Sequence, residues 1–232
     1  MENSQIIRIT ELVKDFPVGT GFFRALNHIN LSFGKGEFAG LVGPSGSGKT
    51  TLLNIMGSLD TPTQGEVLVL DYQIGKLNAQ ESASLRKSQL GFIFQSYNLL
   101  PVYTVYENVE FPLLLLEYSA QERKKMVMES LEWVGLVPKL KSKPNMLSGG
   151  ECQRVAIARA MVKKPMIVLA DEPTANLDAE NSHHILRTME TLNREFTTTF
   201  IFATHDEKVI SYLKRRISLA DGQVQKDETN AK

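Results

Sequence analysis

The sequence contains little that ties it to an oxidising compartment, a membrane interior or a nucleic acid. Cys152 is the one cysteine among 232 residues, so no disulfide can form within the chain and a reducing compartment is expected. The first residues lack the pattern of a signal peptide, and no run approaches the ~20 apolar residues of a membrane span. The 26 basic and 26 acidic residues cancel, which argues against nucleic-acid binding. If the protein acts at a membrane, we expect it to dock on another protein.

The sequence is 42% hydrophobic and 22% charged, which is the composition of an ordinary globular protein. Apolar runs alternate with helical patterns, which is typical of an α/β fold. This pattern predicts strands at 6–12, 29–33, 37–42, 66–70, 90–94, 166–170 and 199–204, and helices at 50–57, 120–134, 151–163 and 179–196. The polar residues 223–232 are expected to be frayed.

A mostly helical block interrupts the alternation in the middle of the chain. The strand pattern stops after residue 96 and returns near residue 166, and Pro144 and Asn145 break the block before its last helix. We therefore predict a single domain, 1–232, with a core lobe formed by 1–96 and 165–232 and an inserted helical lobe formed by 97–164.

A glycine-rich loop follows the strand expected at 37–42. The pattern G-x-x-x-x-G-K-[ST] is matched by Gly43, Pro44, Ser45, Gly46, Ser47, Gly48, Lys49 and Thr50, with Thr51 next in the expected helix. The glycines let backbone N–H groups point at phosphates, and the helix N-terminus adds a positive partial charge. Lys49 is expected to reach the β- and γ-phosphates, and Thr50 to bind Mg²⁺. A plain glycine turn is the alternative, but a chance match has odds of roughly one in a hundred.

Two carboxylates end the continuous apolar run at 166–170. Such a run is expected for a strand covered on both faces of a parallel sheet, and ligands bind at the carboxyl ends of these strands. Asp171 is expected to hold magnesium, directly or through water, and Glu172 to position the attacking water. An isolated Asp-Glu pair would fit a polar turn, but that explanation is poor beside a phosphate loop.

The string Leu147-Ser148-Gly149-Gly150-Glu151 precedes the helix expected at 151–163 and forms a second candidate anion site. Taken alone, Ser148 is better explained as an ordinary helix cap. The chain nevertheless carries two helix N-termini suited to phosphates. In a two-fold dimer, each ATP would lie between the glycine loop of one subunit and residues 148–150 of the other. The residues alone leave open that both loops fold onto one nucleotide.

Together these motifs resemble the ATP-binding subunit of ABC (ATP-binding cassette) transporters, from about residue 7 to residue 222. The resemblance implies a P-loop NTPase core of the RecA type, N-terminal antiparallel strands and an inserted helical subdomain. It also implies ATP and Mg²⁺ as cofactors, and a homodimer in which Ser148, Gly149, Gly150 and Glu151 act on the ATP of the opposite subunit.

The same resemblance assigns four further residues. Phe16 would stack on adenine, Gln95 would contact magnesium and the lytic water, and His205 would contact the γ-phosphate. Asp178, in the string Asn176-Leu177-Asp178, would contact the other subunit. Glu151 stands where Gln is commoner in the family. Cys152, in the first turn of the same helix, is expected to have a lowered thiol pKa.

The resemblance also implies a membrane permease that docks near Tyr97–Tyr106, and no nucleic acid. The segments 94–95, 98–101 and 107–113 look like the ATPases of lipoprotein-releasing, macrolide-export and cell-division systems. We therefore expect a peripheral protein on the cytoplasmic face of the inner membrane, with lipoprotein release or a related export function first. The alternatives are a cell-division complex and a soluble ATPase of iron–sulfur cluster assembly, the latter disfavoured by the apolar docking stretch.

Overall fold

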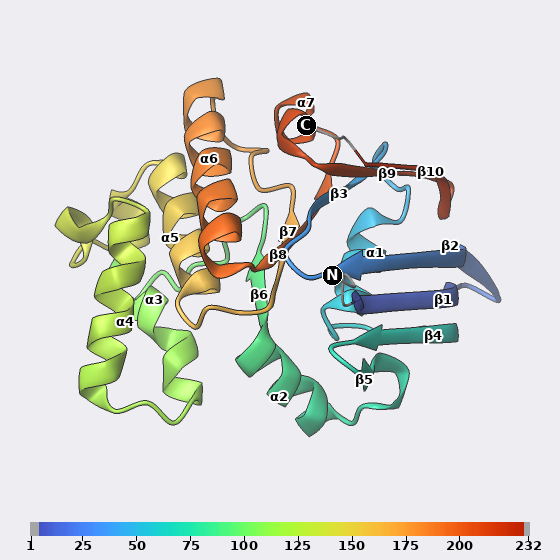
Figure 1. The fold of residues 1–232 in the computed structure, drawn as a ribbon, viewed down its shortest axis with the longest axis horizontal. Coiled ribbons are helices and arrows are strands. Elements are labelled where there is room, and N and C mark those ends of the chain that lie inside the picture. The colour runs from blue at the N-terminus through green and yellow to red at the C-terminus, as the bar shows by residue number, and fades with distance from the viewer. Residues whose placement is uncertain (1–4, 230–232) are drawn as a thin grey trace.

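Two sheets of different construction organise the protein, whose computed structural model describes residues 5–229 (Figure 1). An antiparallel sheet has the order β2-β1-β4-β5, with bounds β1 (Gln5–Val18), β2 (Gly21–Gly34), β4 (Gln64–Val69) and β5 (Tyr72–Gln73). The second sheet has the order β10-β9-β3-β8-β7-β6, with bounds β3 (Phe38–Val42), β6 (Leu90–Ile93), β7 (Ile167–Asp171), β8 (Thr199–Thr204), β9 (Arg215–Ala220) and β10 (Gln223–Thr229). All its pairings are parallel except β9–β10. The predicted P-loop core with N-terminal antiparallel strands is confirmed.

Helices lie on both faces of the parallel sheet. The helices of the described residues are α1 (Lys49–Met56), α2 (Ala79–Gln89), α3 (Val105–Glu110), α4 (Ala120–Trp133), α5 (Gly149–Met161), α6 (Ala179–Phe196) and α7 (Glu207–Tyr212). Helices α3 to α6 gather on one side, and α1 lies between the two sheets, with contacts to β2, β4, β7 and β8 (Figure 1). Within the described residues no helix combines the length and apolarity needed to cross a bilayer.

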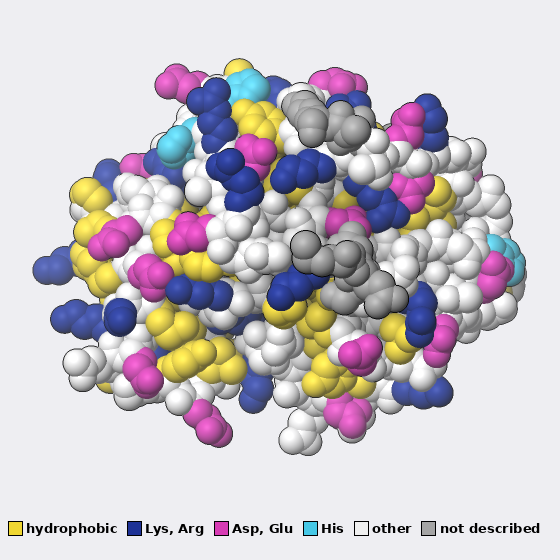
Figure 2. Space-filling model, viewed as in Figure 1, with side chains coloured by type: hydrophobic (Ala, Val, Ile, Leu, Met, Phe, Trp, Pro, Cys, Tyr) yellow, Lys and Arg dark blue, Asp and Glu magenta, His cyan; other side chains and the backbone are white. Residues whose placement is uncertain are grey.

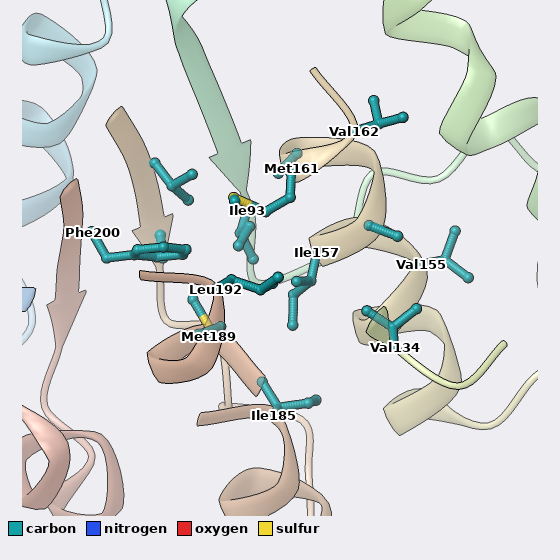
Figure 3. Packing of buried hydrophobic residues seen from close by; sticks show 14 of the residues in the cluster. Ile93, Val134, Val155, Ile157, Met161, Val162, Ile185, Met189, Leu192 and Phe200 are labelled. Carbon is teal, nitrogen blue, oxygen red and sulfur yellow. The ribbon is translucent and has the colours of Figure 1, made fainter. Parts of the chain in front are cut away.

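The two faces of the parallel sheet belong to two hydrophobic cores because side chains alternate along a strand. In β8, Phe200 and Phe202 pack on the helical side, and Ile201 and Ala203 pack towards α1 and the antiparallel sheet. Figure 3 shows the helical side, where side chains of β6, α5 and α6 approach Phe200: Ile93, Ile157, Met161, Ile185, Met189 and Leu192. Both faces of β8 are therefore packed against apolar side chains, and this packing holds in position the strand ends that carry the site.

The C-terminal region differs from the prediction. Residues Gln223–Thr229 were expected to be frayed but form β10, which pairs with β9. Arg215 donates from Nε and Nη2 to the two carboxylate oxygens of Asp227, at 2.8 and 2.6 Å. A polar edge strand is held by backbone pairing and such cross-strand contacts, so hydrophobic periodicity does not reveal it. Residues 230–232 of the predicted frayed segment lie outside the described residues.

Basic and acidic side chains are interspersed over the face drawn in Figure 2, as the balanced composition implies.

Candidate active site

A cavity of about 470 Å³ lies at the carboxyl ends of β3, β6, β7 and β8. The two-stranded β1–β2 ribbon borders the same cavity near its hairpin turn. It is lined by Phe16, Phe23, Ala25, Ser45, Gly46, Gly48, Lys49, Thr50, Thr51, Gln95, Asp171, Glu172 and His205. The structure therefore gathers residues predicted from five separate parts of the chain, and adds Phe23 and Ala25, which sequence reasoning missed. A larger cavity, about 870 Å³, lies between α6 and α7 and contains none of the predicted residues.

The glycine loop presents an uncapped helix N-terminus to this cavity. Gly48, the N-cap of α1, has φ of 99° and makes no side-chain cap, so the first N–H groups of the helix are available to an anion. A Cβ at Gly48 would lie 2.7 Å from the Ala25 carbonyl oxygen, so only glycine fits there. Lys49 Nζ donates to the carbonyl oxygens of Gly43 and Pro44, at 2.7 and 2.8 Å. Burial lowers the pKa of Lys49, against the attraction of Glu172 and Asp171.

Thr50 and Asp171 converge from α1 and β7. Thr50 Oγ1 donates to both carboxylate oxygens of Asp171, each at 3.1 Å. Burial is the main cause that raises the pKa of Asp171, and the Thr50 hydrogen bond acts in the opposite direction. A desolvated carboxylate beside a hydroxyl is an oxygen donor set that suits a hard dication. Gln95 lines the same cavity and offers an amide oxygen.

Glu172 is held in an unusual backbone conformation. Its φ of 45° lies in the left-handed region, which costs a non-glycine residue of order 1–3 kcal/mol. Its N–H donates to the carbonyl oxygen of Ala203 at 2.9 Å. Its carboxylate accepts from Thr204 Oγ1 at 3.0 Å and from His205 Nδ1 at 2.6 Å. The strained backbone and both donors aim this carboxylate into the cavity beside the phosphate loop.

The predicted signature loop lies elsewhere. Ser148 caps α5: its Oγ accepts from the N–H of Glu151 at 3.2 Å, and its own N–H donates to Glu151 Oε2 at 2.8 Å. That second hydrogen bond is the main cause that lowers the pKa of Glu151. None of Ser148, Gly149, Gly150, Glu151 and Asp178 lines the phosphate cavity. Within one chain the signature loop therefore does not line the cavity that the glycine loop forms.

Asp178 lies where α5, the helix that follows the signature loop, contacts the start of α6. It is the N-cap of α6 and accepts from the backbone N–H and from Nδ2 of Asn181, both at 2.8 Å. A Cβ at Gly150 would lie 2.6 Å from Asn181 Oδ1, so the starts of α5 and α6 are in close contact. Asn176 Nδ2 donates to the Gln95 carbonyl oxygen at 3.0 Å. Residues 176–178 thus connect the Gln95 loop with the signature loop.

The expected lowered pKa of Cys152 is wrong. The thiol is buried, with Sγ 3.7 Å from the Pro144 carbonyl oxygen, and burial raises its pKa. Glu151 beside it acts in the same direction. The helix N-terminus favours a thiolate, but here desolvation and the adjacent carboxylate outweigh it.

A glycine loop on a parallel sheet, opposite a carboxylate pair and a histidine, defines a P-loop nucleoside triphosphatase. A family model described as ABC transporter matches residues 26–175. An uncharacterized ABC transporter ATP-binding protein of Methanocaldococcus jannaschii, MJ0796, is 41% identical over 227 residues, which are 96% of this chain and 97% of the relative. The lipoprotein-releasing system ATP-binding protein LolD of Legionella pneumophila is 41% identical over 220 residues, 95% of this chain and 97% of LolD.

Solved structures agree with these relatives. A dimeric structure of the ATP-binding cassette MJ0796 in a post-hydrolysis state, bound to ADP and Pi, has a TM-score of 0.90 and 40% identity, and the match covers 97% of this chain and 99% of that one. CbiO1 of Clostridium perfringens, from the complex cbiONQ, has a TM-score of 0.88 and 28% identity, covering 97% and 88%. The chain belongs to the ABC transporter family, as an ATP-binding and ATP-hydrolysing cassette.

Proposed function

We propose that this cassette is the motor of a membrane transporter whose spanning part is a separate polypeptide, and that two copies close on ATP to drive it. The observation that carries the proposal is the separation of the two anion sites within one chain. The uncapped N-terminus of α1 lies in the phosphate cavity, and the α5 N-terminus at Ser148 lies outside it. A second copy can bring its Ser148–Gly150 turn to the γ-phosphate, and the relative MJ0796 has a dimeric structure.

In the proposed reaction, phosphates replace the Gly43 and Pro44 carbonyls as partners of the Lys49 ammonium. Phe16 stacks on adenine. Thr50, Gln95 and Asp171 would hold Mg²⁺, which would neutralise phosphate charge when bound. Hydrolysis would take place at the carboxyl ends of β7 and β8, where Asp171, Glu172 and His205 line the cavity.

Glu172 orients the attacking water and accepts its proton. Its carboxylate is paired with His205, whose side chain is 61% exposed. His205 is proposed to contact the γ-phosphate, so this pair would link the general base to the phosphate that is cleaved.

Residues 97–164 are proposed to move as one lobe when the dimer closes. Arg159 of α5 donates to the carbonyl oxygens of Tyr97 and Asn98, two residues that both have positive φ, 62° and 48°. Gln95 is linked through its carbonyl to Asn176. These contacts connect the nucleotide site, the other subunit's contact loop and the helical lobe.

A groove of about 430 Å³ between α2, α5 and the 3₁₀ turn Phe111–Leu115 is the proposed docking site. Most of its lining is apolar, including Leu59, Phe92, Phe94, Phe111 and Leu115. Docking was expected near Tyr97–Tyr106, and of that segment Asn98 lines the groove. Leu99 and Tyr106 pack against the core, whereas Val102 is 71% exposed.

Four cations border the groove, and three of them donate to backbone carbonyls instead of carboxylates. Arg86 donates to the Ser58 carbonyl, Lys163 to those of Arg86 and Lys87, and Arg159 to those of Tyr97 and Asn98. Among residues 5–229 none of the three forms an ion pair with a carboxylate. Burial lowers the pKa of Lys163 to about 8. The groove therefore suits a short helix with an apolar face and a carboxylate at its edge.

The 41% sequence identity to LolD, over nearly the whole of both chains, supports lipoprotein release or a related export function. On this proposal the cassette is peripheral on the cytoplasmic face of the inner membrane. The apolar groove supports a membrane partner over the scaffold of a soluble iron–sulfur assembly system.

Leu115 and Leu114 provide a matched test of docking. They are 56% and 52% exposed, but only Leu115 lines the groove. We expect Leu115→Ser to lose both co-purification with a multi-span protein from detergent-solubilised membranes and the stimulation of ATPase activity by that protein. Leu114→Ser should retain both, and the ATPase rate of each isolated variant should be normal. Capture of a soluble scaffold instead, or equal behaviour of the two variants, would contradict the proposal.

A further inference from the structure

Phe16 and Phe23 are direct cross-strand neighbours in the β1–β2 ribbon. Both residues line the phosphate cavity, which Thr50 and Asp171 also line. Ala25, two residues after Phe23, lines the same cavity, as the period-two alternation of a strand requires. Phe22, which pairs with Pro17, does not line it. The register thus brings a second aromatic ring to the predicted adenine position.

Packing within the chain does not explain Phe23. The side chain is 56% exposed and belongs to neither hydrophobic core. Across residues 5–229 its ring forms no aromatic pair and no contact with a cation. An exposed phenylalanine alone would need no explanation. One that lines a nucleotide cavity in register with the predicted base-stacking residue has a ligand to meet.

Polar contacts hold the two rings in position. Arg24 and Asp15, the neighbouring pair in the ribbon, are joined by two hydrogen bonds, from Nε at 2.9 Å and from Nη2 at 3.0 Å. The Asp15 N–H donates to Thr63 Oγ1 at 3.0 Å, which ties the ribbon to the start of β4. Lys14 Nζ lies 4.9 Å from the centre of the Phe16 ring. These contacts within the chain are therefore enough to hold the two rings in the β1–β2 ribbon in place.

We propose that Phe23 is a second nucleobase contact and forms with Phe16 a two-ring platform for adenine. The assignment rests on ATP occupying this cavity as proposed above, and adds a residue to the site. Neither ring carries a hydrogen-bonding group, so the platform recognises the flat face and the size of a purine and not its polar edge. Removal of one ring from such a stack is expected to weaken nucleotide binding by roughly 5- to 30-fold.

The test compares ADP with pyrophosphate, which shares its phosphates and lacks the base. By isothermal titration calorimetry with Mg²⁺ present, Phe23→Ala should bind ADP roughly 5- to 30-fold more weakly and pyrophosphate with unchanged affinity. Phe23→Tyr should restore ADP binding. Phe22→Ala, at a position that is 77% exposed, is the matched control and should bind both as the parent does.

Unchanged ADP affinity in Phe23→Ala would overturn the platform, and so would an equal loss of ADP and pyrophosphate. If the parent itself bound neither ligand, the ATP site would be wrong as well, so the two failures are distinguishable. A Phe22→Ala loss as large as that of Phe23→Ala would show that the ribbon as a whole, and not the ring at position 23, is responsible.

Discussion

Asp171 illustrates the compromise that a proposed metal ligand imposes on a stable protein. Its carboxylate is desolvated at the end of β7, and burial raises its pKa although Thr50 donates to it. The ionised form is therefore less favourable in the folded chain than in the unfolded one. Binding of a cation would reverse this penalty, so the residue is suited to the nucleotide-bound protein at the expense of the empty one.

Asp171→Asn should therefore stabilise the nucleotide-free protein at pH 7 while it impairs Mg²⁺-dependent turnover. The folded-state pKa lies above the ordinary value of 3.8, so the penalty is present above the folded pKa and disappears as the pH falls through it. We expect a rise in Tm of a few degrees, since about 1 kcal/mol corresponds to ~2–4 °C at this size. Thermal unfolding without nucleotide over a pH series measures it. A lower Tm at pH 7, or a gain that does not shrink towards acidic pH, would contradict this explanation.

Residues within contiguous motifs could be predicted from the sequence, whereas those joined by tertiary contacts could not. Lys49, Thr50, Asp171 and Glu172 follow from a loop and a strand end read along the chain. Phe23 acquires its place only through the pairing of β1 with β2. Cys152 was misjudged because the helix position is visible in the sequence and the burial that raises the thiol pKa is not.

At the scale of elements, the N-termini of α1 and α5 differ in whether a side chain caps them. The first turn of α1 has no side-chain cap, and that of α5 is closed by the Ser148–Glu151 capping box. Helix α1 can therefore take a phosphate directly. In α5, Ser148 already stabilises its own helix, and its two roles can be separated by substitution.

Ser148→Ala should lower the free energy of unfolding by about 1 kcal/mol, the usual cost of a lost N-cap. Ser148→Asp should keep the parent's stability, because Asp caps as well as Ser, yet abolish ATP-dependent dimerisation by setting a carboxylate against the γ-phosphate. Denaturant unfolding and sedimentation measure the two effects. Normal dimerisation of Ser148→Asp would remove this turn from the interface.

Elements with strong periodicity and clear ends were predicted to the residue. Helix α6 and strand β8 have the expected bounds, because Asp178 caps the helix and all six residues of β8 are buried. Helix α2 was not predicted, since Leu85 is its one buried residue and no apolar stripe marks it. Strands β1 and β2 are each 14 residues long, well beyond their apolar parts, because ribbon pairing continues where burial stops.

At the scale of the whole molecule, the proposed mechanism requires two copies. The phosphate cavity is lined by the groups proposed to bind and cleave ATP, and the Ser148 turn lies outside that cavity on the same chain. The segment that carries this turn is tied to the predicted nucleotide site through Arg159 and Asn176. On this proposal, binding of ATP between copies should move the groove where a membrane partner is proposed to dock.

The most direct test of the central claim is the mass of Glu172→Gln in solution. This variant should bind ATP but hydrolyse it roughly 10²–10⁴-fold more slowly, so that the ATP-bound form persists. By sedimentation velocity, we predict a dimer with Mg-ATP and a monomer with Mg-ADP. Adding Ser148→Arg should abolish the dimer while ATP binding is kept. A monomer in saturating ATP, or a dimer that survives Ser148→Arg, would contradict closure of two copies on shared ATP.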